Sequence, residues 1–572
     1  MKIRKFPLLM AAVMMLTLLM ACASDKSPNA DTASTADVSE DIATSDPDAD
    51  KPAADKLYLC SPEKVTLSTF IAQQPSGYTD LLTNTFTTWL EEQTNVHLDM
   101  TIVPADGAKD KLILMFAGGD YPEIITGGFF SNADLMNYGG KEKILIPLND
   151  LIDKHATALK ERWAEMPQLK NDMTAPDGNI YGIPSLDSAG IGHPQCSYKM
   201  WMNMEWLKNL NLDVPTTTAD FKKVLMAFKN DDPNGNGKAD EIPLTGAINT
   251  WNADPYKFIL NAFDYFDFDT LLKLKDGKIS FTANTDGFRE GLRYMADLYA
   301  NGLIDPAAFT QNEQQMSAIG NNEDVAIVGA CGAGHLGMLV GVNFVERMKE
   351  YDNILPLQGP NGYRGIPYNV TPRVSGAAFA ITDKCPAEKQ EVAIKWADLF
   401  CREEIVIRAQ IGIQGKNWDV ADPGTIGIDG KTTASYKYLT FSSSGEVATQ
   451  NDIWGWTMRL IEPDWKNKFQ FVGDIYDPTN YEARLLRATV KLQPYAADVE
   501  QIPPFFLSTD DSARIAQIFA PLQDYVKTSI VEFITGKKNV DRDWDAYIAG
   551  LSKLKYEEYV RLNQAAYDNL TK

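Results

Sequence analysis

From residue 57 onward, short apolar segments alternate with longer amphipathic segments along the chain. Residues 65–70 predict a strand, and in residues 78–94 the apolar side chains recur at the spacing of a helix. Residues 96–103 alternate apolar and polar positions as a half-buried strand does, and residues 109–117 predict a second helix. Residues 123–126 predict a third strand after a turn. This alternation is typical of an α/β layer with a parallel sheet.

The same alternation continues through the rest of the chain and becomes mainly helical after about residue 510. Further helices are predicted at residues 217–229, 286–300, 387–403, 512–535 and 543–569, and further strands at residues 325–328 and 377–381. No repeat of 20–50 residues and no low-complexity linker interrupts this body. The pattern therefore favours two closely connected α/β lobes with a helical C-terminus over a string of separate domains.

The first 22 residues have the organisation of a secretory signal peptide. Basic residues lie among the first five, residues 6–20 are apolar, and residues 19–22 read Leu-Met-Ala-Cys. This ending resembles the bacterial lipobox, and the resemblance implies that residues 1–21 are removed and that Cys22 is diacylated with fatty acids such as palmitate. The alternative is an ordinary signal peptide in which the cysteine occurs by chance.

A polar, acidic segment separates Cys22 from the folded body. Residues 23–55 contain nine acidic residues and two lysines, and they are rich in Ala, Ser, Thr and Pro. Such a segment cannot bury enough apolar surface to offset the entropy of ordering it. We expect residues 22–56 to be a lipidated, disordered tether that spans roughly 30 Å.

Composition excludes several classes of function. The chain has 54 basic and 77 acidic residues, a net charge of −23, which repels a phosphate backbone and argues against nucleic acid as a partner. Four histidines leave little room for a His-rich metal enzyme, and six cysteines in 572 residues are too sparse for a disulfide scaffold. We expect mostly free and buried thiols.

Residues 232–243 resemble a calcium-binding loop. Oxygen-bearing side chains occupy loop positions 1, 3, 5, 9 and 10, glycine occupies position 6, and position 7 can offer its carbonyl. An EF-hand has a bidentate glutamate at position 12, where this chain has Pro243, so Glu241 would have to replace it. The alternative is an Asn- and Gly-rich surface turn. The predicted ligands of a structural Ca²⁺ are Asp232, Asn234, Asn236, Lys238, Asp240 and Glu241.

Several motifs in a fixed order resemble those of extracellular solute-binding lipoproteins of carbohydrate ABC importers, the calcium-containing relatives of maltose-binding protein. The motifs lie at residues 118–123, 177–184, 206–217, 227–229, 232–243, 298–306, 411–418 and 565–568. The resemblance covers about residues 57–570 and implies a two-lobed, type II periplasmic-binding-protein-like fold whose lobes are joined by hinge strands and close over a sugar. It places residues 57–187 with about 372–418 in the N-terminal lobe. It places about 188–371 with about 419–572 in the C-terminal lobe.

The same resemblance implies a monomer that captures a carbohydrate and delivers it to the permease of an ABC transporter, on the outer face of the cytoplasmic membrane. Aromatic side chains can stack on sugar rings, and polar ones can orient hydroxyl groups. The candidates for ligand contact are Phe129, Phe130, Tyr181, Tyr198, Trp201, Trp251, Arg373, Trp418, Trp454 and Trp456. Each could instead be an ordinary core or surface residue, and Arg373 could form a structural salt bridge.

Trp251 is the foremost of these candidates. It follows a short predicted strand at residues 242–246, and ligands of two-lobed α/β proteins lie beyond the carboxyl ends of the strands. The alternative is that Trp251 packs against Phe258 and Phe263 in the core.

Two further interpretations compete with solute binding. Residues 332–337 fit the dinucleotide pattern G-x-G-x-x-G, but no strand that ends in an acidic residue follows at the right distance. A secreted carbohydrate-active enzyme needs two carboxylates about 5–10 Å apart, which counting cannot test, but no G-x-S-x-G or H-E-x-x-H motif is present. An adhesive surface lipoprotein is the third alternative. We expect a binding protein rather than an enzyme.

The lipobox generates the first testable prediction. Replacing Cys22 with Ala should release the protein from the cell envelope, because two acyl chains anchor a protein stably and their removal leaves only a polar tether. Membrane fractionation and immunoblotting measure this. Unchanged retention of Cys22→Ala in the membrane fraction would show that the anchor lies elsewhere.

Overall fold

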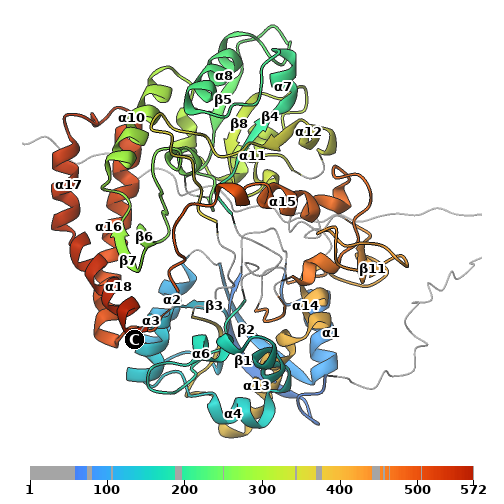
Figure 1. Cartoon of the computed structure of the whole chain (residues 1–572). Coiled ribbons are helices and arrows are strands. Elements are labelled where there is room, and N and C mark those ends of the chain that lie inside the picture. The colour runs from blue at the N-terminus through green and yellow to red at the C-terminus, as the bar shows by residue number, and fades with distance from the viewer. Residues whose placement is uncertain are drawn as a thin grey trace, which may run out of the picture. The chain divides into compact units, whose positions relative to one another are not determined.

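The computed structural model describes residues 58–73, 80–104, 107–186, 196–248, 250–341, 344–368, 376–440, 451–454, 458–462, 464–503 and 505–570 (Figure 1). The chain divides into two units, Met1–Asp55 and Lys56–Lys572, and every described residue belongs to the second unit. The predicted signal peptide, the lipidation site at Cys22 and the tether lie outside the described residues. None of the described helices is both long and apolar enough to cross a membrane.

The first sheet has the strand order β10-β3-β1-β2. Strands β1 (Val65–Gln73), β2 (Val96–Pro104) and β3 (Ile124–Phe130) are parallel, whereas β10 (Ala377–Ile381) is antiparallel to β3. Helices α1 (Thr85–Thr94) and α2 (Ala108–Gly118) connect the parallel strands. The predicted parallel sheet is therefore confirmed, and a strand from much later in the chain completes it.

The second sheet has the order β5-β8-β4-β9 and is mixed. Strands β5 (Ile242–Thr245) and β8 (Val328–Gly332) are parallel, and β4 (Met200–Asn203) is antiparallel to both β8 and β9 (Tyr351–Asn353). In Figure 1, helices α7 (Met204–Asn209) and α8 (Thr218–Asn230) lie beside this sheet. Because β5 and β8 run in the same direction, their carboxyl ends lie at the same edge.

Smaller elements complete the fold. Two hairpins stand apart from the main sheets, β6 (Leu272–Lys275) with β7 (Lys278–Phe281) and β11 (Trp418–Val420) with β12 (Tyr436–Tyr438). The remaining helices of eight or more residues are α5 (Thr157–Glu165), α10 (Asp286–Ala300), α11 (Glu313–Gly320), α13 (Ala387–Asp398), α14 (Glu403–Gln410), α15 (Tyr481–Val490), α16 (Thr509–Ile534), α17 (Trp544–Lys553) and α18 (Tyr556–Leu570). Shorter helices are α3 (Asn132–Asp134), α4 (Asn149–His155), α6 (Pro167–Met173), α9 (Lys257–Leu260) and α12 (Val345–Lys349), and a π-helix spans Leu135–Lys141.

Three predicted elements have different limits in the structure. The first helix begins at Thr85 rather than at residue 78, because the Asn84 side chain accepts a hydrogen bond from the Phe86 N–H and caps it. The buried strand predicted at residues 325–328 lies further along the chain, since β8 begins at Val328 and ends at Gly332. The helix predicted at residues 543–569 is two helices, which are separated at Lys555 by a left-handed backbone conformation (φ 65°).

Each sheet contributes to its own hydrophobic core. One core contains residues of β1, β3, α1 and α13, and Trp454 joins it with its ring 5.1 Å from that of Phe86 in an edge-on arrangement. Another core joins β4 and β5 to α8, α10 and the C-terminal helices α16 to α18. All five cysteines in the described part of the chain are free and buried, as expected from the sequence. Burial raises the pKa of the Cys60 thiol to about 12, which leaves it unreactive.

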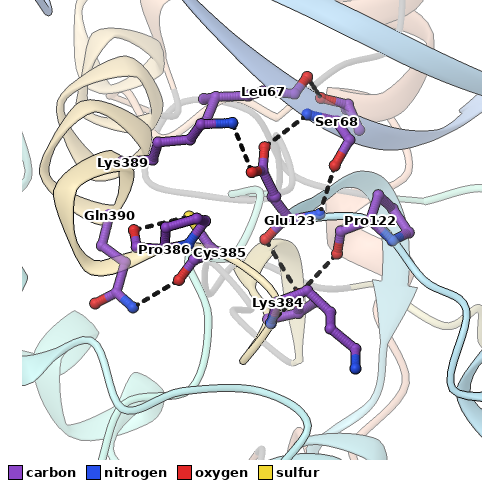
Figure 2. Close-up of polar contacts among 11 residues, drawn as sticks. Leu67, Ser68, Pro122, Glu123, Lys384, Cys385, Pro386, Lys389 and Gln390 are labelled. Atoms are coloured by element: carbon purple, nitrogen blue, oxygen red, sulfur yellow. Dashed lines mark hydrogen bonds and ion pairs between the residues drawn. The ribbon is translucent and has the colours of Figure 1, made fainter.

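A polar network around Glu123 joins α13 and the segment after β10 to β1 and the start of β3 (Figure 2). The Glu123 carboxylate accepts a hydrogen bond from the Ser68 N–H (2.9 Å) and pairs with the Lys389 ammonium (2.7 Å). The Glu123 N–H in turn donates to the Ser68 hydroxyl (3.0 Å), and its carbonyl accepts from the Thr382 N–H (3.0 Å). One side chain thus connects β1, the start of β3 and helix α13.

This network predicts a clear loss of stability when Glu123 is removed. Glu123→Ala should lower the free energy of unfolding by about 2–3 kcal/mol, because it leaves the Ser68 N–H and the Lys389 ammonium without their acceptor. The matched control is Lys395→Ala, which breaks an ion pair with Glu391 on the exposed face of α13 and should cost less than about 1 kcal/mol. Denaturant unfolding of both variants measures the difference, and equal losses would contradict the role of Glu123.

Candidate functional site

Polar and aromatic side chains gather at the carboxyl edge of the second sheet. Strand β5 ends at Thr245 and β8 at Gly332, and the first residue of β4, Met200, pairs with Gly332 at this edge. The segments that continue from β5 and β8 carry Trp251 and residues 334–337, and Lys199 directly precedes β4. Ligands of α/β sheets bind at such edges because loops, rather than strands, present the side chains there. We call Lys199, Trp251, Gly334, His335 and Tyr481 the edge cluster.

Trp251 presents its ring to solvent at this edge. The side chain is 61% exposed, although tryptophan is usually well buried. The ring lies close over the backbone of Gly334, where a Cβ atom would come within 2.4 Å of it, and its centroid is 6.4 Å from that of the His335 ring. Phe258 and Phe263 are buried in a core that does not include Trp251. The alternative of a core tryptophan is therefore wrong, and one face of the ring is open.

His335 is held in place by Tyr481. Its Nδ1 lies 3.0 Å from the Tyr481 hydroxyl, and that hydroxyl accepts a hydrogen bond from the Gly337 N–H (2.7 Å). Burial lowers the pKa of His335 to about 4, an effect that Glu482 opposes and that Lys199 and Lys466 reinforce. The imidazole is therefore neutral at physiological pH.

Lys199 is a buried member of the edge cluster. Its ammonium donates to the Cys196 carbonyl and to the Gly334 carbonyl (3.4 Å), which fixes the backbone under the Trp251 ring. Burial lowers the pKa of Lys199. A second buried cation, Lys257, pairs with the buried carboxylate of Asp254 at 2.8 Å.

The other predicted contact residues lie elsewhere or in the core. Five of the rings are buried and covered by neighbouring side chains, so the expectation that they line a ligand surface is not supported by their positions: Phe130, Tyr181, Tyr198, Trp201 and Trp454. The Trp201 indole donates to the Ala333 carbonyl (3.1 Å), and the Trp454 indole donates to the Thr87 hydroxyl (2.6 Å). Trp418 is partly buried and donates to the Gly412 carbonyl (3.0 Å). The side chains of Phe129, Arg373 and Trp456 lie outside the described residues.

Sequence reasoning missed Lys199 and Tyr481. A lysine directly before a fully buried strand is a visible signal, because burial of an ammonium requires acceptors nearby. Nothing in the sequence joins Tyr481 to His335, which precedes it by 146 residues. The glycine pattern at residues 332–337 is followed only by a short 3₁₀ turn at Leu336–Met338. No helix N-terminus is available there for a phosphate, so the pattern is not a dinucleotide site.

The predicted calcium loop joins α8 to β5. Asp232 and the two glycines of the loop, Gly235 and Gly237, have left-handed backbone conformations. The Asp232 carboxylate accepts hydrogen bonds from the N–H groups of Asn236 (3.2 Å) and Gly237 (3.0 Å). The Asn234 amide lies 3.1 Å from the Asp240 carboxylate. The chain thus folds its oxygen-bearing side chains inward, as the spacing of these residues predicts.

The donor set of this loop fits a hard cation, and one atom requires an explanation. Glu241 Oε1 is buried without a hydrogen-bond partner in the described part of the chain. Burial raises the pKa of Glu241, and the carboxylates of Asp240 and Asp232 raise it further. Across the described residues, however, no three His, Cys, Asp or Glu side chains are grouped closely enough to hold a metal ion. A cation would therefore need the amide and backbone oxygens of the loop as well.

The chain is similar to known bacterial solute-binding proteins. Residues 72–405 match the family described as bacterial extracellular solute-binding proteins. The fructooligosaccharide ABC transporter substrate-binding protein FusA of Streptococcus pneumoniae serotype 4 (strain ATCC BAA-334 / TIGR4) is 32% identical over 517 residues, which cover 88% of this chain and 90% of FusA. The polygalacturonan/rhamnogalacturonan-binding protein YtcQ of Bacillus subtilis (strain 168) is 28% identical and covers 59% of this chain and 64% of YtcQ.

Solved structures of FusA resemble the whole described body. S. pneumoniae FusA in complex with kestose has a TM-score of 0.73 and 28% sequence identity, and the match covers 89% of this chain and 99% of that one. A FusA EF-hand mutant in complex with fructo-nystose gives the same values.

Proposed function

Because this chain belongs to the family of bacterial extracellular solute-binding proteins, we propose that it captures an oligosaccharide at the edge cluster of its second sheet. The chain is a carbohydrate-binding protein of an ABC importer, and its two-lobed α/β fold class is the one predicted from the sequence. The named relatives are binding proteins rather than enzymes, which favours capture and delivery of a solute over hydrolysis.

We infer that the solute is a short fructooligosaccharide. The observation that carries this inference is the similarity to FusA along 88% of the chain, together with an open tryptophan ring at the edge where a ligand would lie. An exposed ring seated on a glycine backbone presents a flat apolar face to the C–H groups of a sugar. The neighbouring polar groups can then orient its hydroxyls.

A thermal-shift screen tests the ligand class. Kestose and fructo-nystose should raise the melting temperature of the protein, because a ligand that binds only the folded state stabilises it. Maltotriose and oligogalacturonate serve as matched carbohydrates of another class. Incubation of each sugar with the purified protein, followed by chromatography, should recover it uncleaved. Failure of both kestose and fructo-nystose to stabilise the protein, or release of cleavage products, would overturn the proposed function.

Trp251→Ala tests the position of the site. We expect affinity for kestose to fall about 10- to 100-fold if stacking contributes about 1.5–3 kcal/mol, while stability hardly changes because the side chain is 61% exposed. Trp251→Tyr keeps an aromatic face and should lose less. Leu114→Ala, which alters another exposed side chain (69%), is the control. Calorimetry that found full affinity in Trp251→Ala would place the sugar elsewhere.

We also propose that the loop at residues 232–243 holds a structural Ca²⁺ through the side chains of Asp232, Asn234, Asn236, Asp240 and Glu241 and the carbonyl of Lys238. The support is the donor set, the unpartnered and buried Glu241 oxygen and the presence of an EF-hand in FusA, of which an EF-hand mutant has been solved. A bound cation would neutralise three carboxylates that otherwise repel one another. The ion would brace the connection from α8 to β5, at the end of the strand opposite Trp251.

Removal of the metal tests this proposal. Chelator should lower the melting temperature, and added Ca²⁺ should restore it. Asp232→Ala should abolish this response, whereas Asp213→Ala, which removes an exposed carboxylate between α7 and α8, should preserve it. If Ca²⁺ leaves the melting temperature of metal-free protein unchanged, with the metal content verified by elemental analysis, the loop is only a turn.

The proposal includes the cellular setting predicted from the sequence. The family is described as extracellular, which supports a position outside the cell. The monomeric state and the tether through diacylated Cys22 are part of the proposal on the basis of the sequence alone. The lobe limits near residues 187, 372 and 418 also remain a prediction. The return of β10 to the first sheet supports a chain that crosses between lobes more than once.

A further inference from the structure

We propose that Asn132 is a positioning residue that fastens two segments from the second sheet's core to the first sheet, and that this hold between the two sheets supports sugar capture. Asn132 is the first residue of α3 and lies two residues beyond the end of β3. It therefore follows the carboxyl end of a strand, where α/β proteins present ligand contacts. Its side-chain amide, however, is engaged at both ends by the backbone of other segments.

The two ends of the Asn132 amide bind different segments. Its Oδ1 accepts a hydrogen bond from the Gly376 N–H (2.7 Å), and its Nδ2 donates to the Phe505 carbonyl (3.3 Å). A backbone N–H can only donate and a backbone carbonyl can only accept, so the two partners fix the orientation of the amide. These partners lie 244 and 373 positions further along the chain. One side chain thus joins three distant parts of the sequence.

Gly376 belongs to the segment that leads from the second sheet's core into β10. Ile366 is fully buried in that core, and β10 begins at Ala377 in the first sheet. Gly376 has a left-handed backbone (φ 71°), and a Cβ atom there would lie 1.6 Å from the Phe130 carbonyl oxygen. This close approach requires glycine, and it brings the Gly376 N–H against the Asn132 side chain.

Phe505 belongs to a second segment, which reaches the first sheet and returns. Ile502 packs against the core of the second sheet, whereas Phe506, four residues later, packs against the core between the first sheet and α2. Helix α16 follows, and it returns to the second sheet's core through side chains such as Val526. The bond from Asn132 to the Phe505 carbonyl therefore lies where this segment contacts the first sheet's side of the protein.

The same two segments also contact each other near the second sheet. Ile366 and Ala496 form a parallel bridge, in which the Ile366 N–H donates to the Tyr495 carbonyl (3.0 Å) and the Ala497 N–H donates to the Ile366 carbonyl (3.0 Å). The segments are thus joined by backbone bonds at one end and through the Asn132 side chain at the other. Because the backbone bridge needs no particular side chain, Asn132 is the position where a substitution can release them.

Asn149 provides a matched control, because its amide makes the same kind of bonds within the first sheet's side of the protein. Its Oδ1 accepts from the Ile180 N–H (2.9 Å), and its Nδ2 donates to the Gly178 carbonyl (3.0 Å). Both partners lie in one short segment, and Ile180 is buried in a core of the first sheet. Removal of Asn149 therefore costs two comparable hydrogen bonds but leaves the connection between the sheets in place.

Distances between spin labels test the role of Asn132 directly. Labels at Leu114→Cys in α2 and Val214→Cys between α7 and α8 are attached to exposed positions, one beside each sheet. The five cysteines in the described part of the chain are buried, and Cys22→Ala removes the sixth. In the absence of sugar, Asn132→Ala should give a broader distribution of distances than the wild type. Asn149→Ala should leave the distribution unchanged, although it lowers the melting temperature to a similar extent.

Two results of this measurement would overturn the inference. They are a wild-type distribution in Asn132→Ala and equal broadening in Asn132→Ala and Asn149→Ala. Asn132→Asp keeps the inference falsifiable if Asn132→Ala does not fold. It preserves the volume and the acceptor for the Gly376 N–H, but it sets a carboxylate oxygen against the Phe505 carbonyl. It should therefore broaden the distribution as well, and a wild-type distribution in Asn132→Asp would contradict the inference.

Calorimetry with kestose tests the contribution to sugar capture. This arm rests on the proposed function, because it requires a sugar at the edge cluster that the first sheet's side also contacts. Asn132→Ala should weaken kestose binding about three- to tenfold, as the loss of one hydrogen bond would, and Asn149→Ala should not. Unchanged affinity in Asn132→Ala would refute the contribution to capture. If the wild type binds neither kestose nor fructo-nystose, the proposed function fails, and the label distances still decide whether Asn132 holds the sheets together.

Discussion

The antiparallel pairing of β10 with β3 is the contact on which the arrangement of this protein depends. Ala377 lies opposite Phe130 and Ile381 opposite Ile124, so the chain returns to the first sheet after it has contributed all four strands of the second sheet. The network of Glu123, Thr382 and Lys389 reinforces this return. Without the return, the second sheet would be attached to the first by one connection only. With it, the chain crosses between the two sheets repeatedly, as a two-lobed binding protein requires.

The edge cluster illustrates what such a site costs in stability. A tryptophan ring is left open to solvent and an ammonium is buried against carbonyls. Two glycines occupy positions where a larger residue would restrict the unfolded chain but would not fit the folded one. None of these features improves the packing of the core that joins the second sheet to the C-terminal helices. Binding of a flat, hydroxyl-rich ligand at this edge accounts for all of these features.

Much of the fold could be predicted from the sequence, because hydrophobic periodicity reports which face of an element is buried. The strands at residues 65–70, 96–103 and 377–381 and the helices at residues 217–229 and 286–300 correspond closely to β1, β2, β10, α8 and α10. Element limits were less predictable. The Asn84 side chain caps the start of α1, and the left-handed backbone of Lys555 separates α17 from α18. Neither feature changes the hydrophobic pattern from which the elements were predicted.

The candidate site was only partly predictable. Trp251 could be singled out because it lies in the segment that follows β5, and position after a strand is a local property. In the sequence, a buried tryptophan such as Trp201 or Trp454 cannot be distinguished from one that stacks on a sugar. Only the packing around the ring in the folded protein separates the two cases. The contact between His335 and Tyr481 joins distant segments, so no local pattern could reveal it.

The most direct test of sugar capture at the edge cluster is a crystal structure of the protein with kestose bound. We predict a sugar ring stacked on the open face of Trp251. Electron density for the sugar at a place remote from Trp251 and from the carboxyl edge of the second sheet would contradict this prediction.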